Sequence, residues 1–170
     1  MKMLRVLLPA ALLLAACGDT PQGTVAVGKP VPPYVAQVLD GDRTSLADLQ
    51  GRPVLLNVWA TWCGPCQKEI PSLEALHREY GPKGLRVVGV SIDQASEQQA
   101  IREFMQEHGV SFDVWLDPSG DVTSQFSMIG VPNTFLIGSD GTLLWKKVGP
   151  VHATDQELRG LIEKSLPSAT

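Results

Sequence analysis

Cysteine and histidine are both scarce in this sequence, with three residues of each in a chain of 170. A tetrahedral zinc site needs four ligands, yet Cys63 and Cys66 have only one further cysteine in the chain to join them. The histidines do not complete a site, because none forms a close ligand pair with another (His77, His108 and His152). The sequence therefore argues against zinc, and we predict no metal site.

Basic residues are also in the minority. The chain has 14 Lys and Arg against 18 Asp and Glu, a net charge of −4. Removing Lys2 and Arg5 with the leader segment described below would leave 12 basic and 18 acidic residues, a net charge of −6. Charge of this sign attracts neither nucleic acid nor an anionic membrane surface. We therefore expect no nucleic-acid partner.

The apolar run at the N-terminus is too short to span a bilayer as a helix. It extends from Val6 to Leu14 behind two basic residues, so residues 1–16 are predicted to be a secretory signal peptide. The ending Leu14-Ala15-Ala16-Cys17 resembles the lipobox of bacterial lipoproteins, in which the signal is cut before the cysteine and its thiol is acylated. Cys17 is thus the predicted lipidation site. The alternative is an ordinary signal peptide with Cys17 as a spare thiol.

The remaining 154 residues, 170 minus the first 16, have the length of a single domain. We divide the chain into a signal peptide at 1–16, a lipidated N-terminus and tether at 17–27, and a folded domain at 28–170. A tether of this length could reach on the order of 30 Å. We expect a monomer that is attached to a membrane through lipid on Cys17.

The segment Trp62-Cys63-Gly64-Pro65-Cys66 carries the chemistry. It follows the apolar stretch 54–60, so the two thiols lie where a strand gives way to a helix. Cysteines at i and i+3 of a first helical turn face each other and can form a disulfide without backbone movement. We expect Cys63 to be exposed at the helix N-terminus, which stabilises its thiolate, and Cys66 to be buried. A purely structural bridge would close too short a loop to remove much chain entropy, so a redox-active pair is favoured.

The hydrophobic periodicity predicts an α/β fold. We expect an N-terminal hairpin at 34–39 with its turn at 40–42, and a helical turn at 46–49. The predicted strands are 53–60, 85–92, 114–116, 135–137 and 143–145, the last two forming a hairpin around 139–141. The predicted helices run from Cys63 to Tyr80 with a bend at Pro71, from a Ser96-x-x-Gln99 capping box to His108, over 122–128, and from a Thr154-x-x-Glu157 capping box to Leu166. Such an order favours a central mixed sheet covered by helices on both faces.

With these motifs in place, the chain resembles the thioredoxin superfamily, specifically its extracytoplasmic TlpA/ResA-type branch. The likeness covers about residues 28–166. It depends on the run Trp59 to Cys66, on Pro71, on Gly130-Val131-Pro132-Asn133-Thr134-Phe135, and on an extra helix and strand segment between the strands 85–92 and 114–116. The resemblance implies a thioredoxin-like fold with an N-terminal β-hairpin and this additional segment.

The resemblance also implies roles for single residues. Pro132 would be a cis-proline that faces the dithiol, and Trp59 would pack beneath it. Thioredoxin has a buried aspartate six residues before the first cysteine, where this chain has Asn57, which cannot take a proton. TlpA/ResA-type proteins have a glutamate three residues after the second cysteine, which matches Glu69. Glu69 would then accept the proton of Cys66, unless it is simply a solvated residue of the first helical turn. The surface that receives a partner would be formed by Trp62, Gly64, Pro65, Val131 and Pro132.

We therefore expect a thiol-disulfide oxidoreductase that needs no cofactor beyond the Cys63–Cys66 pair. Cys63 would attack a client disulfide and Cys66 would resolve the mixed disulfide. The Gly-Pro dipeptide between the cysteines is the one found in reducing thioredoxins, so we predict a reductase fed by a membrane thiol reductase. The expected location is the periplasmic face of a bacterial membrane. Clients such as apocytochrome c, a copper-centre assembly protein or a general pool of oxidised proteins fit equally well.

Other functions stay open at this point. Copper carriers use the same soft thiolates but usually add a histidine, which has no recognisable counterpart here. Thiol peroxidases share the fold but have a threonine three residues before a lone reactive cysteine, which Thr61-Trp62-Cys63 does not match. An inert anchored lipoprotein is the remaining alternative. Titration with Cu(I), peroxide turnover and insulin reduction distinguish the three.

Overall fold

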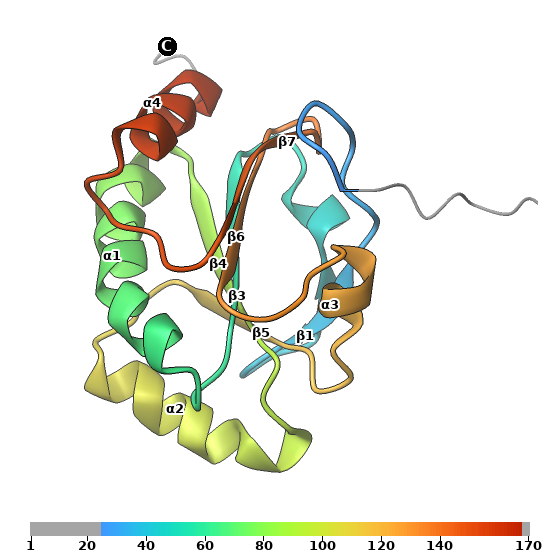
Figure 1. Cartoon of the computed structure of the whole chain (residues 1–170), viewed down its shortest axis with the longest axis vertical. Coiled ribbons are helices and arrows are strands. Elements are labelled where there is room, and N and C mark those ends of the chain that lie inside the picture. Colours follow the sequence, from blue (N-terminus) through green and yellow to red (C-terminus); the bar gives the residue numbers. More distant parts are fainter. Residues whose placement is uncertain (1–24, 168–170) are drawn as a thin grey trace, which may run out of the picture.

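A seven-stranded mixed sheet forms the centre of the protein (Figure 1). The computed structural model describes residues 25–167. The strands are β1 (Val35–Val38), β2 (Arg43–Ser45), β3 (Val54–Trp59), β4 (Arg86–Ser91), β5 (Asp113–Leu116), β6 (Asn133–Ile137) and β7 (Leu143–Val148). The helices are α1 (Gly64–Tyr80), α2 (Gln98–Glu107), α3 (Asp121–Gln125) and α4 (Gln156–Ser165), with short 3-10 helices η1 (Leu46–Leu49), η2 (Gly81–Lys83) and η3 (Ala95–Glu97).

The strand order is β2-β1-β5-β4-β3-β6-β7. Strands β3, β4 and β5 run parallel to one another, whereas β1 pairs antiparallel with β5, β6 with β3, and β7 with β6. The carboxyl ends of β3 and β4 therefore lie at the same edge of the sheet, next to the start of β6. This edge is where the cysteine motif follows β3.

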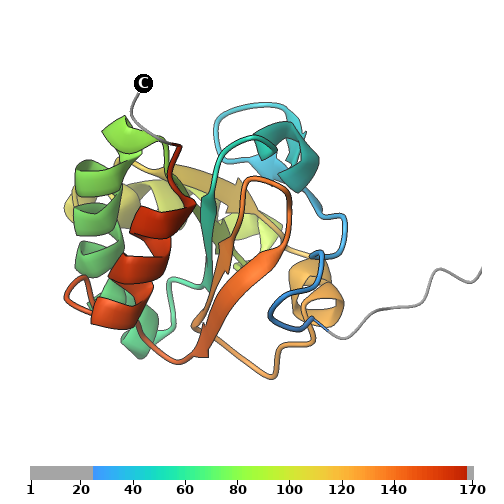
Figure 2. The ribbon, with the colours of Figure 1, turned by 90° about the horizontal axis from the view of Figure 1, so that it is seen from above.

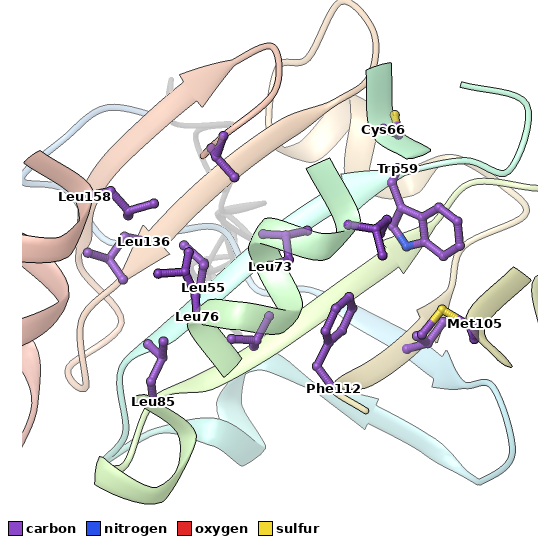
Figure 3. Packing of buried hydrophobic residues seen from close by; sticks show 14 of the residues in the cluster. Leu55, Trp59, Cys66, Leu73, Leu76, Leu85, Met105, Phe112, Leu136 and Leu158 are labelled. Atoms are coloured by element: carbon purple, nitrogen blue, oxygen red, sulfur yellow. The ribbon is translucent and has the colours of Figure 1, made fainter. Parts of the chain in front are cut away.

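The two faces of the sheet bury separate hydrophobic clusters because successive strand residues point to opposite sides. Leu55 and Trp59 of β3 join the cluster with α1, α2 and α4, while Val54, Leu56 and Val58 join the cluster with α3 and η1. Figure 2 shows α1 and α4 together on one side of the sheet and α3 on the other. Figure 3 shows the first cluster filling the space between α1 and the strands.

The predicted arrangement is confirmed. The N-terminal hairpin forms from β1 and β2, η1 is the helical turn expected at 46–49, and β6 and β7 form the C-terminal hairpin. The extra segment between β4 and β5 contains α2, and it delivers β5 to a position between β1 and β4. The N-terminal hairpin therefore lies at one edge of the sheet, where β1 pairs with β5, and β5 separates it from β4 and β3.

Two predicted helix starts are wrong. The Ser96-x-x-Gln99 capping box does not form, because Gln94 and Glu97 make a capping box two residues earlier. The Gln94 N–H donates to Glu97 Oε2 at 2.9 Å, and η3 leads directly into α2. A carboxylate is the stronger acceptor for that N–H. Helix α4 is capped by Asp155 instead of Thr154, since Asp155 Oδ1 accepts from the Leu158 N–H at 3.1 Å.

Helix α3 is shorter than predicted. It ends at Gln125 and does not continue to Met128, because Ser127 adopts a left-handed backbone conformation with φ of 52°. The Met128 N–H then donates back to the Thr123 carbonyl at 2.8 Å, which closes the helix end and turns the chain outward. This turn leads into the segment that precedes Pro132.

The folded part of the chain begins earlier than residue 28. Val25 falls within the predicted tether, yet it is buried in the cluster beneath α3, and its carbonyl accepts a hydrogen bond from Lys146 Nζ at 2.9 Å. The predicted signal peptide at 1–16, the lipidation site Cys17 and the tether up to residue 24 lie outside the described residues. Among the helices within 25–167, none combines the length and apolar character needed to cross a membrane.

Candidate active site

The cysteine pair lies at the junction of β3 and α1. Cys63 is the N-cap of α1 with an extended backbone, and Gly64 and Pro65 occupy the first two helical positions. Cys63 and Cys66 are joined by a disulfide with their Cα atoms 5.2 Å apart. Cys63 Sγ also accepts a hydrogen bond from the Cys66 N–H at 3.2 Å. The sequence prediction that the two thiols face each other at the first turn is thereby confirmed.

The two sulfurs differ less in exposure than expected. Cys66 is completely buried, but Cys63, which we predicted to be exposed, is only 5% exposed. The disulfide and the hydrogen bond to the Cys66 N–H turn the Cys63 sulfur inward, where both cysteines belong to the same buried cluster as Trp59. Val131 packs against the edge of this cluster. Trp59 lies beside Cys66 in Figure 3. Trp62, by contrast, is 64% exposed.

Strand β6 brings a second segment to the same place. The register of β3 and β6 pairs Val58 with Asn133, so the residues before Asn133 lie next to the end of β3. The Val131–Pro132 peptide bond is cis, as the resemblance implied. The Pro132 carbonyl accepts a hydrogen bond from the Gly149 N–H at 2.9 Å, which ties this segment to the loop after β7.

Glu69 lies one turn beyond Cys66 on α1 and is 1% exposed, so it is not a solvated surface residue. Its Oε1 accepts a hydrogen bond from Asn57 Nδ2 at 2.8 Å, and its Oε2 accepts one from the Val151 N–H at 2.9 Å. Asn57 Nδ2 also donates to Thr134 Oγ1 at 2.9 Å. A polar network thus links α1, β3, β6 and the loop after β7 within an otherwise apolar core.

Burial raises the pKa of the Glu69 carboxyl from its ordinary value of 4.5 to about 7. Three groups oppose this effect by stabilising the carboxylate: the Val151 N–H, the Asn57 amide and, from a greater distance, the Lys147 ammonium. A buried carboxyl with a pKa near neutrality is able both to hold and to accept a proton under physiological conditions. The arrangement therefore provides a dithiol and an acid-base group in one site.

The hydrogen-bond partners of Glu69 were not predicted from the sequence. Asn57 was expected only to be unable to take a proton, whereas its side-chain amide binds Glu69, and no role was expected for Thr134 or Val151. A signal was present for two of them, because Asn57 and Thr134 are polar residues inside buried apolar strands. The Val151 N–H could not have been found, since every residue type except proline has a backbone N–H.

Known proteins share this architecture. The AhpC/TSA family profile matches residues 27–146. The chain is similar to a thiol-disulfide oxidoreductase ResA of Bacillus cereus, with 32% identity over 177 residues, covering 98% of this chain and 100% of the relative. It is similar to ResA of Bacillus subtilis (strain 168), with 33% identity over 140 residues, 78% of this chain and 77% of the relative.

Among solved structures, a candidate thiol:disulfide interchange protein DsbE from Chlorobium tepidum has a TM-score of 0.76 and 29% identity, covering 85% of this chain and 100% of that one. The curated relatives are named for the chemistry that the Cys63–Cys66 disulfide supports, and the family match extends over most of the chain. The chain therefore belongs to the AhpC/TSA family of thioredoxin-like proteins and is a thiol-disulfide oxidoreductase.

Proposed function

We propose that the protein is an extracytoplasmic reductase of disulfides in client proteins, anchored to a bacterial membrane by lipid on Cys17. The observation that carries the proposal is the Cys63–Cys66 disulfide at the N-terminus of α1, with Glu69 buried one turn further along the same helix. The two electrons are carried by the cysteine pair, so no bound cofactor or metal is required.

Cys63 is the attacking sulfur in this proposal. Its thiolate attacks one sulfur of the client disulfide, the client S–S bond breaks, and the second client sulfur leaves as a thiolate that takes a proton from water. Cys66, as a thiolate, then attacks Cys63 Sγ, and the mixed disulfide breaks to release the remaining client thiol. The client gains two electrons and two protons, and the Cys63–Cys66 disulfide is restored.

Glu69 assists the second step. Cys66 is completely buried, so its thiol has no direct route to water and needs a nearby acceptor for its proton. Glu69 is ionised in about half of the molecules at pH 7, since its pKa is about 7. Its carboxylate takes the proton of Cys66 during resolution, while Asn57 and the Val151 N–H hold it in position.

The client binds at the surface around the disulfide. Trp62 is exposed on one side of Cys63, and the Val131–Pro132 segment approaches from β6. Gly64 and Pro65 keep the first turn of α1 free of bulky side chains. An extended segment of the client pairs with the backbone beside Pro132, and the apolar side chains of this surface cover its disulfide.

The direction of electron flow is the second part of the proposal. The Gly64-Pro65 dipeptide is the one found in reducing thioredoxins, for which the potential is about −270 mV, against about −120 mV for strongly oxidising relatives. A gap of this size corresponds to about 7 kcal/mol. The periplasm contains no reducing buffer, so a membrane thiol reductase must return the pair to the dithiol. The lipid on Cys17 would keep the domain within its reach.

Two experiments test the proposal. Equilibration with glutathione and dithiothreitol gives the potential, and a value near −120 mV would make the protein an oxidase. Trapping with Cys66→Ala should capture a client through Cys63, with Cys63→Ala as the matched control that captures none. Recovery of equal amounts with both variants would remove the assignment of Cys63 as the attacking sulfur. Greater recovery with Cys63→Ala would reverse it. Apocytochrome c, copper-centre assembly proteins and a general protein pool are then distinguished by identifying the trapped partner.

A further inference from the structure

Asp93 is a buried carboxylate just beyond the end of β4, with 3% of its surface exposed. Both of its oxygens accept the Thr61 N–H, at 3.1 and 3.0 Å, and Oδ1 accepts the Thr61 hydroxyl at 2.6 Å. The Ser91 hydroxyl donates to Oδ2 at 2.7 Å. Because all of these partners donate to the carboxylate, the contacts are those of an ionised side chain.

The residue that Asp93 holds begins the turn between β3 and the redox pair. The turn closes through a hydrogen bond from the Cys63 N–H to the Ala60 carbonyl at 3.2 Å. The Thr61 carbonyl accepts from Gln67 Nε2 at 2.6 Å, so its outer side is fixed by α1. Asp93 fixes the other side from β4. The turn that carries Cys63 is therefore held between two elements through the single residue Thr61.

Asp117 provides an internal comparison. It follows β5 as Asp93 follows β4, and it is buried to nearly the same degree, with 5% of its surface exposed. Its carboxylate accepts the Asp121 N–H at 3.1 Å, the Val122 N–H at 2.7 Å and the Ser119 hydroxyl at 2.9 Å. These are the contacts of a helix start, because they satisfy the first N–H groups of α3. The Asp93 carboxylate instead holds Thr61, which precedes the redox pair.

We propose that Asp93 is a positioning residue of the redox centre, which fixes the turn at Thr61 and thereby orients Cys63 for attack and Trp62 for client contact. The proposal rests on the proposed role of Cys63 as the attacking sulfur. Asp93 also places a buried carboxylate against the turn that carries Cys63, through its contact with Thr61, which precedes Cys63 by two residues in the sequence. That charge opposes formation of the Cys63 thiolate and so favours the disulfide over the dithiol.

Three variants separate the effect of the Asp93–Thr61 hydrogen bonds from the effect of the negative charge on Asp93. Thr61→Val removes the hydroxyl and leaves the charge of Asp93. Asp93→Asn removes the charge but keeps an oxygen for Thr61, while its amide donates to the Ser91 hydroxyl oxygen. Asp93→Ala removes both. The matched control is Asp117→Ala, which deletes a similarly buried carboxylate whose side-chain contacts are with the start of α3 and not with Thr61. The readouts are the rate constant for reduction of insulin, the equilibrium constant with glutathione and the thermal midpoint.

Thr61→Val should slow attack roughly tenfold, because misplacement of a reacting group by about 1 Å costs up to a hundredfold in rate. Asp93→Asn should retain most of the rate but shift the glutathione equilibrium toward the dithiol by about threefold or more, since the charge is gone. Asp93→Ala should show both effects. Asp117→Ala should lower the thermal midpoint and leave the rate and the equilibrium constant within about twofold of wild type.

The inference is overturned if the Asp93 variants lower the thermal midpoint but match Asp117→Ala in rate and glutathione equilibrium. Asp93 would then only stabilise the fold. If Asp93→Ala does not fold, Thr61→Val and Asp93→Asn still distinguish the two roles, because each keeps part of the contact. Failure of the proposed function is recognised separately in the wild-type protein, by a potential that is that of an oxidase, or by capture of clients through Cys63→Ala.

Discussion

The buried Glu69 should make the stability of the protein fall as the pH rises through neutrality. In the folded protein its pKa is about 7, against an ordinary value of 4.5 that applies to the unfolded chain. Between these two pH values the folded state holds the proton and the unfolded state does not. The free energy of unfolding therefore decreases as the pH increases across this window. The contribution is complete below pH 4.5 and is lost above pH 7.

The size of the effect follows from the two pKa values. Their difference, from 4.5 to about 7, corresponds to about 3 kcal/mol at 1.36 kcal/mol per pKa unit. No discount for solvent screening is needed, because Glu69 is 1% exposed. A typical domain has a total stability of about 5 to 15 kcal/mol, so this single carboxyl contributes a measurable share.

Glu69→Gln removes the titration while keeping the shape. The new amide oxygen still accepts the Val151 N–H, and the new N–H group faces Asn57. Asn57 Oδ1 has no hydrogen-bond partner among residues 25–167, so rotation of the Asn57 amide by half a turn supplies an acceptor, and the Thr134 hydroxyl then donates to the same oxygen. The variant should therefore fold with residue 69 still bonded to Asn57 and Val151, and any cost of the rotated Asn57 NH2 group is the same at every pH.

The assay is urea unfolding of the disulfide form, in which neither thiol titrates, from pH 4.5 to 8.5. Relative to wild type, Glu69→Gln should gain about 3 kcal/mol between the ends of this range. The exposed Glu79 on the same helix is a control that should stay flat over this range, because its hydrogen bond to Arg159 lowers its pKa below the ordinary 4.5 and its contribution is lost only as the pH falls below that value. A difference between wild type and Glu69→Gln that is constant with pH, or that grows toward low pH, would refute the reasoning.

Three further outcomes are expected. Alkylation of the reduced protein near neutral pH should label Cys63 before Cys66, because only Cys63 retains any contact with solvent, and mass spectrometry of the labelled peptides shows the order. Asp155→Ala should lower the free energy of unfolding by about 1 kcal/mol and Thr154→Ala by much less, which urea titration measures directly. Ile129→Ser should slow insulin reduction without lowering the thermal midpoint, because this side chain is fully exposed and lies three residues before Pro132; an unchanged rate would remove Ile129 from the client surface.

The sequence predicted the features that depend on neighbouring residues. The apolar run of β3, the helical spacing of α1 and the cysteine pair are all encoded within a few neighbouring positions. The order of the predicted strands and helices then favoured a mixed sheet covered by helices on both faces. The predicted helix starts were wrong where two possible capping boxes overlap in the sequence, as at Gln94 and Ser96. A small offset changes the cap without changing the hydrophobic pattern, so periodicity could not decide between them.

The environment of Glu69 could not be predicted in the same way. Its hydrogen-bond partners lie 12 and 82 residues away in the chain, and Asn57 is joined to Thr134 across 77 residues. Asp93 likewise reaches Thr61 across 32 residues. Such contacts are set by the register of β3 with β4 and β6, which a single sequence does not determine. The resemblance identified Glu69 as a candidate, and only the folded chain shows what holds it.

The redox sulfur is also the cap of a helix, and this dual role gives the protein a built-in spectroscopic reporter. Cys63 Sγ accepts the Cys66 N–H at 3.2 Å, at the start of a helix of 17 residues. A thiolate accepts such a bond more strongly than a disulfide sulfur, because hydrogen bonds to ionised groups are shorter and stronger. The chemical shift of the Cys66 backbone amide proton should therefore differ between the disulfide and the dithiol form of the pair. Its resonance in an NMR spectrum would follow the redox state of the protein without any added label.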